Sequence, residues 1–154
     1  MKGYRKKEIA QRIGKSVSVI QSWTDQKLVL PEIIPAQGRG IARVYSEKNL
    51  LEFAFVADLL SMRLRLETIR AIMEHIRQSD SVKDFFTSER WGEECQLFFS
   101  TDNRESQDVH MFRVVKKGTS SPAADMIDES DSPAVIFVQL DKVLTEAKRH
   151  IEAK

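Results

Sequence analysis

The sequence predicts a mainly helical α+β protein with a helical first half and a small α/β second half. Up to about residue 78, apolar residues recur at the spacings of amphipathic helices, and after it short apolar runs alternate with polar, turn-forming stretches. Charge divides similarly: residues 1–45 carry nine Lys and Arg against three Asp and Glu, residues 46–78 five against five, and residues 79–154 ten against fifteen. We therefore expect a basic domain over residues 1–78 and an acidic region over residues 79–154.

The first two helices are expected to form a helix-turn-helix. Ala10 and Gly14, four residues apart, supply the small residue and the flexible residue that let two short helices cross closely. Ser16 is the residue type that caps the start of a helix, so the second helix is expected to begin there. The apolar residues at helical spacing predict the inward face: Ile9, Ile13, Val17, Ile20 and Trp23.

The other face of the second helix predicts contact with duplex DNA. It carries short polar side chains and one small apolar group: Ser16, Ser18, Val19, Gln21 and Ser22. The major groove accepts such a helix, where Gln can pair with adenine and serine hydroxyls can reach bases or phosphates. The net charge of +6 over residues 1–45, to which Lys6 contributes, suits a polyanion. On spacing alone, an αα-hairpin in some other helical domain is the alternative.

A basic β-hairpin is expected next. Turn-forming residues gather between residues 31 and 43: Pro35, Gly38 and Gly40. The flanking residues 33–34 and 41–45 are short enough to pair as two strands. Such a hairpin, or wing, lies beside the duplex backbone, so Arg39 at its tip and Arg43 on its return strand are the expected phosphate contacts. A loop with two exposed arginines is the alternative.

Four motifs between Tyr4 and Ser46 carry a family resemblance. They are Tyr4-x-x-x-Glu8-Ile9-Ala10, then Gly14 with Ser16 and Ile20, then Leu28-Val29-Leu30-Pro31, and last Arg43-Val44-Tyr45-Ser46. In this order they resemble the DNA-binding domain of the MerR family of bacterial transcription regulators, over residues 4 to about 77. The Arg-Tyr-Tyr-Glu signature of that family is largely absent, since Gln21 replaces the arginine and only Trp23 keeps aromatic character. The chain therefore resembles a divergent member with its own target sequence.

The resemblance implies a function. Members bind duplex DNA through a winged helix-turn-helix, so Tyr45 in the wing motif joins the expected DNA contacts. It implies a homodimer that binds an inverted repeat in a promoter, with RNA polymerase or a small-molecule effector as further candidate partners. Two helices over residues 46 to about 62 and 66 to 77 are expected from their apolar stripes, and the resemblance makes them the support of the wing.

The acidic region is expected to hold three strands and a closing helix. The strand-like runs are residues 95–99, 109–115 and 134–138. The last is a continuous apolar run of the kind that forms a strand buried on both faces. A surface loop rich in Ser, Asp and Pro is expected over residues 118–133.

The closing helix, over residues 141–153, has an apolar stripe that two arrangements explain. Its members repeat at four-three-four spacing: Leu140, Leu144, Ala147 and Ile151. This spacing is that of a coiled-coil seam, which would join two chains. The same stripe could instead pack onto the sheet of its own chain, and the sequence leaves the two nearly even. The resemblance favours the dimer contact.

Other features restrict the function classes. No run of about 18 apolar residues is present, and Met1-Lys2-Gly3 does not begin an apolar signal segment, so we expect a cytoplasmic protein without a membrane partner. One cysteine, Cys95, and three histidines without ligand spacing predict no metal and no cofactor. No catalytic motif is present, so the protein is not expected to be an enzyme. An excisionase-like architectural or adaptor protein, whose second half recruits a partner protein, is the alternative function.

Overall fold

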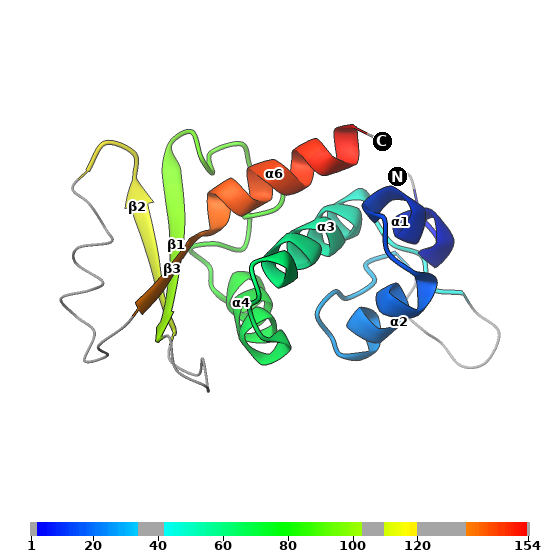
Figure 1. Ribbon diagram of the computed structural model, residues 1–154. Helices are drawn as coiled ribbons and strands as arrows, with labels where there is room; N and C mark the ends of the chain where they lie inside the picture. The colour runs from blue at the N-terminus through cyan, green and yellow to red at the C-terminus, as the bar shows by residue number, and fades with distance from the viewer. Residues whose placement is uncertain (1–2, 34–41, 103–109, 120–134, 154) are drawn as a thin grey trace. The chain divides into compact units, whose positions relative to one another are not determined.

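The computed structural model describes residues 3–33, 42–102, 110–119 and 135–153 (Figure 1). The elements are α1 (Lys6–Ile13), α2 (Val17–Asp25), α3 (Glu47–Ser61), α4 (Leu66–Gln78), β1 (Cys95–Asp102), β2 (His110–Lys116), β3 (Val135–Gln139) and α6 (Leu140–Glu152). The mainly helical α+β class is as expected. The chain forms two compact units, Met1–Glu74 with Glu146–Lys154, and His75–Thr145. Helices α4 and α6 contribute residues to both units.

The turn between α1 and α2 forms where the sequence predicted it. Gly14 ends α1 with a φ of +68°, a conformation that costs glycine little, and the Lys15 N–H donates to the Ala10 carbonyl at 2.9 Å. The Ser16 hydroxyl then accepts from the Val19 N–H at 3.3 Å and caps α2. These local interactions set the entry and exit of the helix-turn-helix.

Aromatic side chains form much of the core behind α2. Trp23 is 6% exposed and its ring stacks on Phe53 of α3, with 6.4 Å between the ring centroids. Tyr45 is fully buried, meets Phe53 edge-on at 5.4 Å, and places its hydroxyl 3.1 Å from that of Thr24. The predicted burial of Trp23 is confirmed. The expected inward position of Val17 is wrong, because this first residue of α2 is 39% exposed.

Backbone pairing joins the N-terminal segment to the residues before α3. Tyr4 and Tyr45 exchange both main-chain hydrogen bonds, at 2.8 and 2.9 Å. This pairing was not expected from the sequence. The predicted hairpin centres on residues 34–41, which lie outside the described residues. The structure therefore describes only the residues on either side of the expected wing.

Asn49, in the first turn of α3, links those two sides. Its Oδ1 accepts from the Glu32 N–H at 3.0 Å and from the Ser46 N–H at 3.2 Å. Its Nδ2 donates to the Leu30 carbonyl and to the Glu52 carboxylate, both at 2.8 Å. The side chain is fully buried and uses both of its polar atoms. One residue thus holds the chain before residue 34 and the chain after residue 41.

The His75–Thr145 unit contains an antiparallel sheet in the order β2-β1-β3 (Figure 1). Phe99 of β1, fully buried, stands opposite Phe112 of β2 and Val138 of β3. The expectation that the last strand is buried on both faces is wrong. In the described sheet β3 is an edge strand, and Ile136 and Phe137 are only half-buried. An antiparallel sheet can have one face on the core and the other in solvent. A strand with a continuous apolar run therefore need not be buried on both faces.

The apolar stripe of α6 is mostly buried within a single chain. Leu140, Leu144 and Ala147 are at most 2% exposed, and Ile151 is half-buried. The fully buried Asp141 carboxylate accepts from the Leu97 N–H at 3.1 Å, which ties the start of α6 to β1. The stripe therefore needs no second chain to cover it. The intrachain alternative accounts for the spacing, and the dimer contact at these residues stays a prediction.

Two further observations concern the single cysteine and the possibility of a membrane-spanning helix. Cys95, the single cysteine, is half-buried at the start of β1, where the strand leaves a turn. Across the described ranges, no helix combines the length and the apolar character needed to cross a bilayer.

Candidate nucleic-acid interface

Helix α2 has one buried side and one side open to solvent. Ile20, Trp23 and Thr24 are buried in the core. The opposite side presents residues at positions i, i+3, i+4 and i+7, which share one helical face: Ser18, Gln21, Ser22 and Asp25. Gln21 is half-buried and the other three are exposed, while Val19 is half-buried at the margin. The side that the sequence predicted to meet DNA is thus the solvent-facing side.

Four charged or polar side chains from three segments meet on this side, and we call them the Asp25 cluster: Lys6, Gln21, Asp25 and Arg43. Gln21 Nε2 donates to both carboxylate oxygens of Asp25 at 2.7 Å, and its Oε1 accepts from Lys6 Nζ. Arg43 donates to Asp25 Oδ1 at 2.8 Å. The structure therefore brings together three residues that the sequence singled out separately. Asp25 was not singled out, although its spacing of four from Gln21 on one helix was a usable signal.

The Asp25 carboxylate contacts Gln21 and Arg43 at a site that stays open to solvent. The hydrogen bond from Gln21 and then that from Arg43 lower the pKa of Asp25, so it is ionised at neutral pH. The Asp25 side chain is 52% exposed and that of Arg43 20%. Ion pairs with so much solvent contact contribute little to stability. A phosphate oxygen could replace Asp25 as the partner of Arg43 at small cost, and the cluster carries two cations for one anion.

The remaining predicted contacts lie in different settings. Ser16 and Ser18 are both exposed. The Ser16 hydroxyl caps α2 and lies 2.8 Å from the Ser18 hydroxyl, so both hydroxyl groups already have hydrogen-bond partners. Tyr45 is 0% exposed, and we assign its side chain a structural role in place of the predicted DNA contact. The resemblance gave its position in the motif but not the direction of its side chain. Arg39 lies outside the described residues.

Metal-binding geometry does not occur among the described residues, where no three His, Cys, Asp or Glu side chains converge. Two histidines instead make other contacts. His75 stacks on Phe112 with 3.7 Å between ring centroids, and His150 Nδ1 lies 3.2 Å from Asp58 Oδ1. The candidate site therefore consists of the polar and charged side chains on α2 and its neighbours.

Comparison with known proteins identifies the family of the N-terminal residues. Residues 4–76 match the family described as MerR HTH family regulatory protein. Three curated relatives, one from Mycobacterium bovis and two from strains of Mycobacterium tuberculosis, are each named as an uncharacterized HTH-type transcriptional regulator. Each is 36% identical over 76 residues, which cover 49% of this chain and 34% of the relative. The chain thus matches about a third of the length of these relatives, and the resemblance read from the motifs is confirmed.

Proposed function

Residues 4–76 are a MerR-family helix-turn-helix domain, and on that premise we propose that the protein is a sequence-specific regulator of transcription that binds duplex DNA. The Asp25 cluster is the observation that carries the proposal. It gathers Lys6, Gln21 and Arg43 from three segments on the solvent-facing side of α2. Arg and Lys suit phosphates, and Gln suits a base edge in the major groove.

We propose further that two copies bind an inverted repeat in a promoter. A two-fold symmetric dimer would place its two α2 helices in successive major grooves, about 34–36 Å apart. The family resemblance supports this arrangement, and RNA polymerase or an effector are the further partners it implies. The test is footprinting of promoter DNA by the full chain, combined with sedimentation of the complex. Two-fold symmetric protection with two chains per site is expected, and protection of one half-site by one chain would contradict it.

Replacement of Arg43 by alanine is expected to weaken binding to all duplexes alike. The change removes a phosphate contact, so the plot of log affinity against log salt should flatten by about one unit of slope. Arg149→Ala is the matched control, since this arginine on α6 pairs with Glu146 and lies outside the Asp25 cluster. Titrations of one operator and one random duplex at several salt concentrations measure both effects. Equal slopes for Arg43→Ala and the parent would remove Arg43 from the interface.

Gln21→Ala is expected to act on sequence preference instead. A side chain that reads a base edge contributes roughly 1–3 kcal/mol of discrimination at that position, with little change in salt dependence. Gln11→Ala, an exposed glutamine on α1, is the control. Competition among single-base variants of the operator gives the measurement. A uniform loss across all variants would mean that Gln21 only positions Lys6 and Asp25.

A further inference from the structure

The amide of Gln21 is held in one orientation by charged groups on either side of it. Its Nε2 donates to both carboxylate oxygens of Asp25 at 2.7 Å, and its Oε1 accepts from Lys6 Nζ. An ammonium group can only donate and an ionised carboxylate can only accept, so turning the amide over would break both contacts. The nitrogen of the amide therefore faces Asp25, at the end of α2, and its oxygen faces Lys6 of α1.

These two contacts leave the Gln21 amide able to bind a base. The two oxygens of a carboxylate lie close together, so a single N–H directed between them accounts for both distances to Nε2. A glutamine amide has a second N–H, and its oxygen has a second lone pair. One donor and one acceptor, side by side and in a fixed order, thus remain for a ligand. In the major groove, adenine offers the matching pair, the acceptor N7 beside the donor N6–H₂.

The stability of the domain does not account for Asp25. The residue ends α2, where the helix dipole disfavours an anion, and its side chain is 52% exposed, so its ion pair with Arg43 contributes little. A carboxylate on a face that approaches phosphates also weakens binding to every duplex alike. The hydrogen bond from Gln21, more than that from Arg43, lowers the pKa of Asp25. The contact with Gln21 is thus the interaction that a role for Asp25 has to explain.

We infer that Asp25 is a positioning residue, which makes the site selective for adenine by fixing the direction in which Gln21 presents its amide. A freely rotating glutamine amide can accept from the N4–H₂ of cytosine or donate to the O4 of thymine. An amide held by Asp25 and Lys6 presents its donor and acceptor in one order, which adenine alone matches with two hydrogen bonds. The inference rests on the proposed binding of duplex DNA and adds to it the residue that makes the reading selective.

Two substitutions separate the hydrogen bond of Asp25 from its charge. Asp25→Ala removes both. Asp25→Asn removes the charge but keeps an oxygen that can accept from Gln21 Nε2, and Arg43, which only donates, favours that orientation of the new amide. Both variants should bind a random duplex more tightly than the parent, roughly fivefold at low salt, because each removes a surface anion close to the phosphates. Only Asp25→Ala should lose selectivity.

Selectivity is measured by competition between the footprinted operator and versions with each other base pair at the position where Gln21→Ala loses discrimination. The parent and Asp25→Asn are expected to prefer A·T there by about 5- to 150-fold, and Asp25→Ala by less than about threefold. Replacement of that adenine by 7-deazaadenine, which lacks the N7 acceptor, should weaken binding of the parent and of Asp25→Asn by at least about fivefold. The same replacement should change binding of Asp25→Ala by less than about twofold.

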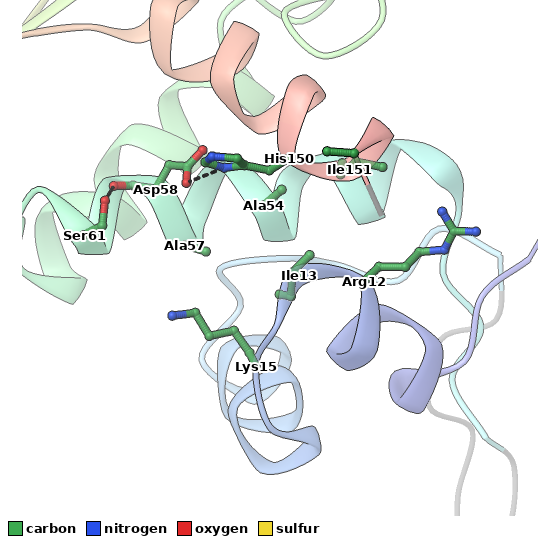
Figure 2. A pocket seen from close by; sticks show the side chains of 10 residues that line it. Arg12, Ile13, Lys15, Ala54, Ala57, Asp58, Ser61, His150 and Ile151 are labelled. Carbon is green, nitrogen blue, oxygen red and sulfur yellow. Dashed lines mark hydrogen bonds and ion pairs between the residues drawn. The ribbon is translucent and has the colours of Figure 1, made fainter.

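Asp58→Asn is the control for the loss of a negative charge elsewhere in the N-terminal unit. Asp58 of α3 contacts His150 of α6 beside a cavity, and none of the described residues that line this cavity belongs to the Asp25 cluster (Figure 2). Burial raises the pKa of Asp58 and so favours its neutral form, which an asparagine amide resembles in shape. The variant is therefore expected to fold and to leave affinity for random DNA and base preference unchanged.

Three results would overturn the inference. If Asp25→Ala prefers A·T as strongly as the parent does, Asp25 does not set the preference, although the proposed function stands. If Asp25→Asn loses as much preference as Asp25→Ala, the charge and not the hydrogen bond is responsible. If the parent prefers another base pair where Gln21 acts, or prefers no duplex at all, adenine is not the base that is read, and in the second case the proposed function fails as well.

Discussion

Truncation of Trp23 to alanine is expected to lower the free energy of unfolding by about 3–5 kcal/mol, the cost of removing a large buried aromatic side chain. The indole is 6% exposed and stacked on Phe53, so its loss opens a cavity between α2 and α3. Urea or thermal denaturation of the full chain gives the measurement. Protein that remains folded should still discriminate operator from random DNA, because Trp23 faces away from the solvent side of α2.

The Trp23→Phe variant is the control for this prediction. A phenylalanine ring can keep the aromatic contact with Phe53 and should lose much less stability than alanine. The opposite pattern is also informative. Should Trp23→Ala melt like the parent and yet bind DNA poorly, the indole would be a DNA contact and its buried position would not describe the active form.

Replacement of Asn49 by leucine is expected to cost more than about 3 kcal/mol. Leucine has a similar size but no polar atoms, so the buried Ser46 N–H, the Glu32 N–H and the Leu30 carbonyl lose the hydrogen bonds that Asn49 makes with them. An unsatisfied buried group costs about 1–3 kcal/mol, and these losses occur together. Chemical denaturation measures the change.

Ser46→Ala provides the comparison, because it removes the side-chain cap of α3 and the hydrogen bond from the Ser46 hydroxyl to the Glu32 carboxylate, and should cost about 1–2 kcal/mol. A loss for Asn49→Leu no larger than that for Ser46→Ala would mean that water replaces the amide. Both variants should be tested for DNA binding as well, since both alter the chain that leads out of the expected wing.

Local signals predicted much of this fold. Gly14 and Ser16 fixed the turn of the helix-turn-helix, because a left-handed residue and a helix cap are properties of one or two positions. The helices α3 and α4 and the three strands occur near their expected bounds for the same reason. The apolar stripe of α6 was equally visible, but periodicity shows only that a face is buried. It does not show whether that face packs in its own chain or against another.

The interactions that could not be predicted join residues far apart in the chain. Arg43 reaches Asp25 across 18 positions, and Asn49 reaches Leu30 across 19. Such contacts depend on how the helices are placed, which no local pattern encodes. Asp58 of α3 is a similar case, because its contact with His150 of α6 joins two residues far apart in the chain.

The hydrogen bonds of Asn49 make the segment between Glu32 and Ser46 a closed ring whose two ends are tied together by the first turn of α3. The entropy of closing a ring grows only slowly with its length, by about 0.6 kcal/mol for each doubling. Insertions, deletions and exchanges within residues 34–41 should therefore leave the rest of the domain intact, whereas Tyr45, also inside the ring, belongs to the core. The stretch between the two tied ends is therefore expected to tolerate changes of sequence and length without rebuilding of the core.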